Sequence, residues 1–328
     1  MAVQDISRSL ASHHEKYFKK VSDSIWEENA ALEQILQMGD VESGVGGDQA
    51  SWRTIARKDT TSIKGWGGWD EPKFQAFNRY ELAKLPWRGY VATYAIPITA
   101  IWENKGDSQI FGLQRMEVKR IRGDILQRFE DDILQGDGTQ DINDDANKGI
   151  HGLLSFLSTT LTYATIAQTG NTFWQAQVLL STGSGQMLTD MFTEYLNCCR
   201  GSDKRTGIPT LIIMPRNYFA FYSARLTNSV RYEDQQKANA GFKDLQFMQT
   251  PVKWSDSMTG NAADQIYFLN AHHLGLKICN EGDMLVSETE TRLAPYTFVG
   301  AIYSHCNLFC DAPRYQGRIN ATATPYTS

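Results

Sequence analysis

The chain has 328 residues, of which 41% are hydrophobic and 21% are charged, and its formal net charge is −5. This composition is typical of a globular protein of about two domains and excludes a disordered or collagen-like chain. The sequence contains no long basic block, so it does not show the basic face that sequence-reading nucleic-acid binders usually carry.

The start of the chain and its cysteines indicate the cellular compartment in which the protein is made. Residues 1–20 are polar and lack the apolar run of a secretory signal. No apolar stretch approaches the roughly 20 residues that span a bilayer. The five cysteines are odd in number, and Cys198 and Cys199 are adjacent, which disfavours a disulfide framework. We therefore expect a soluble protein that is made in a cytoplasm.

The first 51 residues are predicted to form a helix and a linker. Apolar residues recur near helical spacing over residues 5–38, with Asp5 as the N-terminal cap and Gly39 as the stop. Polar residues interrupt the apolar stripe, so we expect this helix to dock weakly or on a partner. Residues 39–51 are rich in glycine and acidic residues, which predicts a linker.

The most informative segment is the aromatic arm that begins at residues 64–69, with the sequence Lys-Gly-Trp-Gly-Gly-Trp. Its glycines leave the backbone without a strong preference of its own. The aromatic side chains carry a large apolar surface that water disfavours. The arm contains Trp66, Trp69, Phe74, Phe77, Tyr80 and Trp87. Such an arm needs a surface to lie on, either on its own chain or on a neighbouring copy.

A strand is predicted directly after the arm. Every second residue from Tyr90 to Trp102 is apolar, which places these residues on one face of a strand. Pro97 lies inside this run. Because proline cannot donate a hydrogen bond to a ladder, we expect the strand to lie at a sheet edge or to bend at Pro97.

A long helix is predicted over residues 107–135. Its apolar residues are three or four positions apart, and most of its charged residues lie off that stripe. Asp107 or Ser108 can cap its start and Gly136 can end it. The stripe consists of Val118, Ile121, Ile125, Phe129 and Ile133. A loop is expected over residues 136–152.

The remainder of the chain is predicted to be mixed α/β. Leu188, Phe192, Tyr195 and Cys199 indicate the face of one helix. A buried strand is expected at Thr210–Met214, and Pro215 can begin a helix that runs to Leu226. Further strands are predicted at Gln265–Leu269, Leu274–Cys279 and Thr297–Asp311, with a turn at Asn270–His273.

Motifs for catalysis and cofactor binding are incomplete throughout the sequence. The chain has no Gly-Lys dipeptide for a phosphate-binding loop and no serine in a Gly-x-Ser-x-Gly elbow. Residues 44–47 begin like a dinucleotide loop, but the third glycine is misplaced and no buried strand precedes it. His14-Glu15 begins like a zinc-protease helix, but Phe18 takes the place of the second histidine. We therefore predict no enzyme activity and no cofactor.

Three groups of residues bear on metal binding, and we predict a metal site at none of them. The groups are His305 with Cys306 and Cys310, the pair His272 and His273, and the cluster Asp137, Asp141, Asp144 and Asp145. The cysteines have no fourth ligand at a suitable spacing and are expected to behave as small hydrophobic residues. The adjacent histidines favour a turn or the surface. The acidic cluster lacks calcium-loop spacing and is expected to be solvated.

The order of four segments resembles the major capsid proteins of tailed phages, which have the Hong Kong 97-type fold. The first is Leu-Pro-Trp-Arg-Gly-Tyr at 85–90 with the strand that follows it. The second is Leu-Gln-Gly-Asp-Gly at 134–138 with Gly-Ile-His-Gly-Leu at 149–153, and the third is the strand–helix step at 211–218. The fourth consists of short motifs at 240–243, 251–252, 266–270, 307–309 and 313–317. The resemblance spans nearly the whole chain.

The resemblance implies an α+β fold with four parts. These are an N-terminal arm at 1–51, an extended β-hairpin loop at 52–105, a peripheral domain with a long spine helix at 106–184 and 275–328, and an axial α/β domain at 185–274. The six aromatic residues of the arm would then contact neighbouring subunits. The N-terminal region is too short for a full cleavable scaffolding domain, which favours a separate scaffolding protein or assembly without one.

The function implied is that of a structural subunit that assembles into the icosahedral head shell around phage double-stranded DNA. Its partners would be copies of itself in hexamers and pentamers, with scaffolding, portal and decoration proteins as further candidates. The shell would enclose DNA without sequence-specific binding, form in the host bacterial cytoplasm and remain in the virion, without membrane contact. The alternatives are an encapsulin-type shell around a protein cargo and a soluble α/β enzyme whose arm covers its own substrate cleft.

Overall fold

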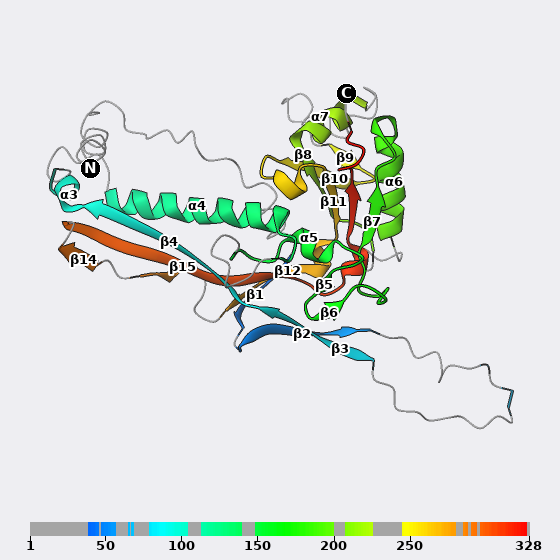
Figure 1. Ribbon diagram of the computed structural model, residues 1–328, viewed down its shortest axis with the longest axis horizontal. Coiled ribbons are helices and arrows are strands. Elements are labelled where there is room, and N and C mark those ends of the chain that lie inside the picture. Colours follow the sequence, from blue (N-terminus) through cyan, green and yellow to red (C-terminus); the bar gives the residue numbers. More distant parts are fainter. Residues whose placement is uncertain are drawn as a thin grey trace.

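The computed structural model describes residues 39–45, 47–56, 65, 67–68, 79–103, 113–139, 148–199, 207–225, 245–279, 285–287, 290–293 and 296–326. The helix predicted over residues 5–38 and the caps predicted at Asp107 and Ser108 lie outside this range. Figure 1 shows three parts: a long ribbon of strands with a helix along it, a two-stranded hairpin below it, and a compact α/β unit at the other end.

The long ribbon is built around β15 (Tyr296–Cys310), which confirms the last predicted strand. Its antiparallel partners are β4 (Arg88–Pro97), β12 (Leu274–Cys279), β13 (Leu285–Val286) and β14 (Glu290–Leu293). A further strand, β1 (Asp40–Val45), joins β12 in parallel at the sheet edge.

Strand β4 shows the predicted alternation and lies at a sheet edge, which is one of the two outcomes predicted from Pro97. Tyr94 and Ile96 are buried, whereas Val91 is exposed. Among the described residues β15 is the only ladder partner of β4, and the ladder ends at Pro97. The prediction that the strand continues to Trp102 is wrong, because the chain turns into helix α3 (Ile98–Glu103). Proline lacks the ladder N–H and has a φ suited to a helix start, so this is a favourable place to leave the sheet.

The predicted linker at 39–51 is also corrected by the structure. This segment forms β1 and the start of β2 (Gln49–Ile55). Pairing with a distant strand determines β1, since Asp40 to Glu42 align with residues 275–277 of β12. Tertiary pairing therefore overrides a composition that by itself favours no strand.

The predicted spine helix is α4 (Leu113–Gln135), which at about 1.5 Å per residue is roughly 35 Å long. It lies along the ribbon of β4 and β15 (Figure 1). The predicted stripe is confirmed, because Val118 is partly buried and four further residues are fully buried: Ile121, Ile125, Phe129 and Ile133. The helix ends before Gly136, where a Cβ atom would lie 2.5 Å from the backbone nitrogen of Gly152.

The chain then crosses to the compact unit through short elements. The described parts of 136–152 contain no helix or strand, which agrees with the predicted loop. Helix α5 (Leu153–Phe156) and the strands β5 (Thr162–Tyr163) and β6 (Ile166–Ala167) follow. The Tyr163 ring stacks on the buried Trp174, with 5.8 Å between ring centroids.

The compact unit contains the second six-stranded sheet. Across the sheet the order is β7 (Gln177–Leu180), β16 (Gly317–Asn320), β11 (Gln265–Leu269), β8 (Leu211–Pro215), β10 (Thr250–Ser255) and β9 (Gln246–Phe247). Helices α6 (Met187–Cys198) and α7 (Arg216–Arg225) pack on the sheet. The predicted step from strand β8 into a helix after Pro215 is confirmed, as are the strands β11 and β12.

The second sheet separates two hydrophobic cores. Alternate residues of β8 point to opposite sides: Leu211 and Ile213 join the core of α4 and β15, whereas Ile212 and Met214 join the core beneath α6 and α7. Both faces of β8 are therefore buried, which explains its continuous apolar sequence. Strands β7 and β16 belong to this sheet although the expected domain division placed them in the peripheral domain.

The predicted packing face of α6 is wrong. Leu188 and Phe192 are exposed, and Cys199 is half-buried just after the helix; of the four predicted residues only Tyr195 is fully buried. The residues that face the sheet include two acidic ones, Asp190 and Glu194. A count of apolar residues cannot find this face, because it depends on polar partners elsewhere in the chain.

Smaller elements and single residues complete the description. The described residues include four 3₁₀ turns: η1 (Ser184–Gln186), η2 (Gly260–Ala262), η3 (Ala271–His273) and η4 (Pro313–Tyr315). The adjacent histidines lie in η3, as predicted for a turn. All five cysteines are free thiols. Within the described ranges, every helix is too short or too polar to cross a bilayer.

Candidate functional site

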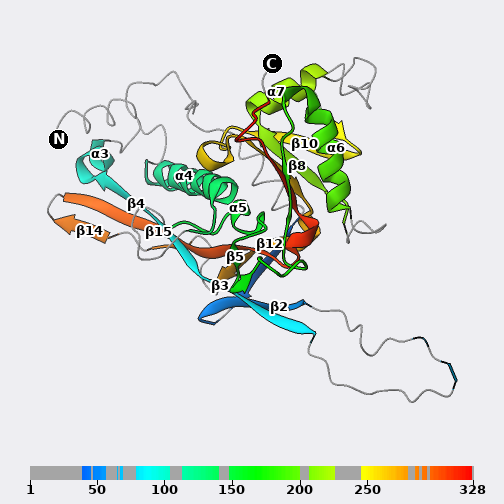
Figure 2. The ribbon, with the colours of Figure 1, turned by 45° about the vertical axis from the view of Figure 1, so that its right-hand side comes forward.

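The hairpin of β2 and β3 (Tyr80–Pro86) extends from the body of the molecule (Figure 2). Its two faces differ in the burial of their side chains. Residues directly opposite one another in an antiparallel pair share a face. On the inner face Ala50 lies opposite Leu85, and both are buried. On the outer face Ile55 lies opposite Tyr80, and these side chains are 66% and 57% exposed.

The outer face of the hairpin carries large apolar side chains near its open end. Leu82 is the next residue after Tyr80 on the same face, lies opposite Arg53 and is 48% exposed. Ile55, Tyr80 and Leu82 therefore form one exposed cluster, which we call the hairpin outer face. Adjacent exposed apolar side chains favour contact with another surface over contact with water.

The inner face anchors the hairpin through aromatic and cationic contacts. The ring of Trp52 lies 5.6 Å from that of Phe309 and 6.4 Å from that of Tyr163, measured between centroids. Lys277 Nζ lies 4.7 Å from the Phe309 ring centroid and forms a 3.0 Å ion pair with Glu42. A cation above aromatic rings is favourable, and more so when it is desolvated as Lys277 is here.

Hydrogen bonds to the hairpin backbone fix the base of the hairpin to the body. The Lys84 N–H donates to the Ala164 carbonyl at 3.1 Å. Ala164 and Thr165 form the turn between β5 and β6 and have φ values of 50° and 68°, unusual for residues other than glycine. Asn307 Nδ2 donates to the Pro86 carbonyl at 2.8 Å. The hairpin is thus rigidly held at its base while its outer face remains open.

The six predicted contact residues fall into three groups. Four lie outside the described residues: Trp66, Trp69, Phe74 and Phe77. Tyr80 belongs to the hairpin outer face. Trp87 is only 7% exposed and donates from Nε1 to the Gly47 carbonyl at 2.9 Å, so it has little surface left for a neighbour. Its role in contacts between subunits remains a prediction.

Two residues of the hairpin outer face were not predicted from the sequence. Neither Ile55 nor Leu82 belongs to a helical stripe in the sequence. The register of β2 with β3 brings them beside Tyr80. Alternation in β3 was the available signal, but it needed the partner strand β2, which spans the end of the predicted linker and the start of the predicted extended loop.

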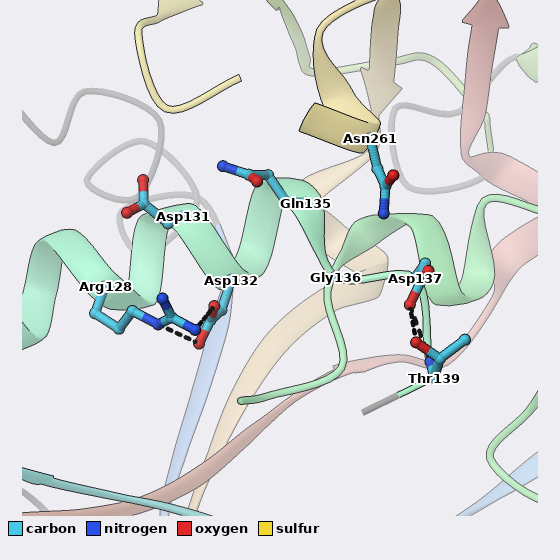
Figure 3. A pocket seen from close by; sticks show the side chains of 8 residues that line it. All are labelled: Arg128, Asp131, Asp132, Gln135, Gly136, Asp137, Thr139 and Asn261. Carbon is cyan, nitrogen blue, oxygen red and sulfur yellow. Dashed lines mark hydrogen bonds and ion pairs between the residues drawn. The ribbon is translucent and has the colours of Figure 1, made fainter. Parts of the chain in front are cut away.

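A polar cleft of about 300 Å³ lies beside the C-terminal end of α4 (Figure 3). Its lining includes Arg128, Asp131, Asp132, Gln135, Gly136, Asp137, Thr139 and Asn261. Figure 3 shows Arg128 reaching along the helix to Asp132, where the ion pair measures 3.1 Å. Asp137 accepts hydrogen bonds from the Thr139 N–H and hydroxyl at 3.0 and 2.7 Å.

The carboxylate of Asp132 also holds the following loop. Tyr90 Oη donates to Asp132 Oδ2 at 2.5 Å and accepts from the Ile150 N–H at 2.8 Å. Burial raises the pKa of Asp132 above its ordinary value, and hydrogen bonds from Tyr90 and Arg128 offset only part of this increase. Burial and the nearby Asp132 charge raise the pKa of Tyr90 well above its ordinary value, so its hydroxyl stays protonated. These contacts are structural, since they tie strand, helix and loop together.

The C-terminal end of α4 is joined to the compact unit by polar contacts. Ser255 Oγ donates to the buried Glu130 carboxylate at 2.6 Å. Tyr267 Oη donates to the Leu134 carbonyl at 2.9 Å, and Gln135 Nε2 donates to the Ser257 carbonyl at 2.8 Å. The spine helix therefore links the long sheet to the second sheet. In the part of the chain that the structure describes, no group of three or more His, Cys, Asp or Glu residues is placed to hold a metal ion.

Comparisons with known proteins identify the fold. No model of a known protein family and no curated protein matches the chain. The capsid asymmetric unit of cyanophage A-1(L) is similar, with a TM-score of 0.64 and 12% identity over 93% of this chain and 96% of that chain. The capsid of the native GTA particle gives a TM-score of 0.64 and 11% identity over 95% and 98% of the two chains.

A third structure with the same fold comes from an encapsulin. It is the holo-SrpI encapsulin complex from Synechococcus elongatus, with a TM-score of 0.60 and 9% identity over 100% of this chain and 98% of that chain. The chain therefore has the α+β, Hong Kong 97-type fold that the order of its sequence segments predicts.

Proposed function

We propose that the protein is a major capsid protein, a structural subunit that self-assembles into an icosahedral head shell around phage double-stranded DNA. One observation carries this proposal: the likeness to phage capsid chains extends over nearly the full length of both chains, 93% and 96% for the cyanophage structure. The proposed role is mechanical, without catalysis or a cofactor.

The hairpin supplies the physical basis for assembly in this proposal. Its outer face would be buried on a neighbouring subunit, together with Trp66, Trp69, Phe74 and Phe77 from the segment that β2 and β3 enclose. Full burial of one large apolar side chain contributes about 1.5–3 kcal/mol, whereas an exposed ion pair contributes about 0–1 kcal/mol. A few such side chains in each of many copies would hold a shell together.

The partners and location follow from the same proposal. The main partners are copies of the chain in hexamers and pentamers, and scaffolding, portal and decoration proteins are further candidates. The DNA is enclosed without sequence-specific contacts. Assembly takes place in the cytoplasm of the bacterial host, and the protein ends in the virion.

Particle formation by the purified protein tests the proposal. We expect megadalton material in size-exclusion chromatography and closed shells of uniform diameter in negative-stain microscopy. A soluble α/β enzyme would instead elute as a small oligomer. A monomer or small oligomer at all protein concentrations and salt conditions tested, with folded circular dichroism, would refute the capsid proposal.

An encapsulin-type compartment is the second candidate. The observation that favours it is the match to the encapsulin complex over 100% of this chain. The content of particles isolated from their natural source separates the two candidates. A head shell contains double-stranded DNA, whereas a compartment contains one protein cargo at a fixed ratio to the shell protein. Nuclease-protected DNA, measured by absorbance and gel electrophoresis, would support the head shell.

A further inference from the structure

Helix α6 has its charged residues inward and its largest apolar residues outward. Its only charged residues, Asp190 and Glu194, are 3% and 0% exposed. Leu188, Phe192 and Leu196 are 37%, 44% and 50% exposed, and a spacing of four residues places them on one side of the helix. We call these three residues the α6 stripe. A surface helix of a monomeric protein normally has the opposite arrangement.

Asp190 fixes the rotation of α6 about its axis. Its carboxylate accepts hydrogen bonds from the Thr182 N–H at 3.0 Å and from the Thr182 hydroxyl at 2.7 Å. Tyr326 Oη donates to the same carboxylate at 2.7 Å. A rotation that buried the α6 stripe would break all three bonds and leave the carboxylate without them, which is strongly unfavourable.

Glu194 holds the same rotation one turn further along. It accepts a hydrogen bond from Asn197 Nδ2 at 3.2 Å and another from the Arg318 backbone N–H. The helix approaches β16 so closely that a Cβ atom on Gly317 would lie 2.5 Å from Glu194 Oε1. The exposure of the α6 stripe is therefore fixed by the fold and is not an accident of a loosely held helix.

The outward side of α6 carries no charge at all. The exposed residues beside the stripe include Thr189, Thr193 and Asn197, which are also uncharged. Each copy of the chain has a net charge of −5, so two copies repel each other unless the meeting surfaces avoid like charges. A surface whose acidic residues are turned inward is suited to contact with a second copy. Figures 1 and 2 show α6 on the flank of the compact unit that is remote from α4.

We infer that the α6 stripe is an assembly interface that is buried against an adjacent copy of this chain. This inference rests on the proposed function and specifies a contact between the compact units of neighbouring subunits. The stripe exposes on the order of 200–300 Å², well below the roughly 800 Å² per partner that a stable pairwise interface buries. The stripe alone does not hold a dimer. It acts together with the hairpin, because simultaneous contacts strengthen one another.

A photo-crosslinker at position 192 tests which surface covers the stripe. Benzoylphenylalanine replaces Phe192, particles are assembled from a mixture of ¹⁴N- and ¹⁵N-labelled subunits, and crosslinked peptides are identified by mass spectrometry after irradiation. We expect peptide pairs of mixed isotope composition, because the partner is another copy. Crosslinks confined to one chain, including residues 1–38, or crosslinks only to a different protein, would overturn the inference. The absence of any crosslink in intact particles would overturn it as well.

A charge placed on the stripe gives an independent test. Phe192→Lys should reduce particle yield at least tenfold, measured by sedimentation, while its circular dichroism spectrum and melting temperature stay those of the unassembled wild type. Ala220→Lys is the matched control, since it places the same charge on an exposed position of α7 in the same unit, and its yield should stay within twofold. Normal particles from Phe192→Lys would refute the inference and leave the proposed function intact. If the wild type forms no particles, both fail.

Discussion

The buried carboxyl of Glu194 should make the stability of the subunit depend on pH. Its pKa is raised from the ordinary value of 4.5 to about 7, chiefly because burial disfavours the charged form. Between these values the folded chain binds a proton that the unfolded chain releases, so the free energy of unfolding falls as pH rises. At about 1.4 kcal/mol for each tenfold change in proton affinity, the loss above pH 7 reaches about 3 kcal/mol.

Glu194→Gln removes this ionisation while keeping the shape of the side chain. At pH 8 the variant should be more stable than the wild type by about 2 kcal/mol, since about 1 kcal/mol is lost where the new amide faces Gly317 without a partner. At pH 5 the carboxyl is protonated in the folded chain, and the variant should show no gain.

Urea denaturation followed by tryptophan fluorescence at pH 5, 6.5 and 8 measures the difference, with sedimentation velocity confirming that both proteins are in the same assembly state. The control is Glu42→Gln, whose side chain is exposed and meets the buried Lys277. It should not become more stable as the pH rises. The reasoning is refuted if the stability difference between Glu194→Gln and the wild type is the same at all three pH values.

Three further predictions concern the hairpin and the end of the spine helix. Trp52→Ala should lower the free energy of unfolding by about 2 kcal/mol in urea denaturation, because a half-buried ring leaves the core. Ile55→Ala, at an exposed position, should change it by less than about 0.5 kcal/mol. Equal effects of the two substitutions would contradict the inner-face anchor. Replacing residues 57–78 by an Asn-Gly turn should abolish particles in negative-stain microscopy while the circular dichroism spectrum stays native. A flexible insert of the same length as the replaced segment should not restore the particles. Unchanged particles would count against the hairpin's role. Gly152→Ala should lower the free energy of unfolding by about 3 kcal/mol, since the new Cβ would lie 2.6 Å from the Ile133 carbonyl oxygen. The cause is steric, because the Gly152 φ of −83° is ordinary for any residue. A melting temperature equal to that of the wild type would refute this prediction.

The elements that could be predicted from the sequence are those whose pattern is local. The stripe of α4 repeats over four turns, and the alternation from Tyr90 to Ile96 depends only on one exposed and one buried face. Pro97 restricts the strand by backbone chemistry that needs no tertiary context. The strand–helix step at Pro215 has the same origin. The glycine at position 136, by contrast, is required by the close approach of the Gly152 backbone.

The elements that could not be predicted depend on distant partners. Strand β1 exists because β12, more than 230 residues later, offers it an edge. The buried face of α6 is set by Thr182 and Tyr326, which give Asp190 its hydrogen bonds. Apolar counting places Leu188 and Phe192 inside because it assumes that carboxylates stay in water. That assumption fails where a carboxylate is fully hydrogen-bonded.

This failure has a physical meaning for assembly. A sequence rule that fails in an otherwise consistent fold indicates a site where another requirement competes with the stability of the single chain. Burying Asp190 and Glu194 requires compensating hydrogen bonds, and exposing the α6 stripe gives up apolar burial within the subunit. The lost apolar burial is recovered when another surface covers the stripe, as the proposed interface would.

The hairpin follows the same logic on a different part of the molecule, with Trp52 and Lys277 holding one face so that Ile55 and Tyr80 remain outside. Each exposed cluster is too small to stabilise a pair of subunits on its own, so isolated encounters dissociate quickly. Once a subunit contacts neighbours through both surfaces, the second contact forms at a high effective concentration and dissociation becomes slow. Two weak surfaces at separate places therefore favour a growing lattice of copies over stable dimers.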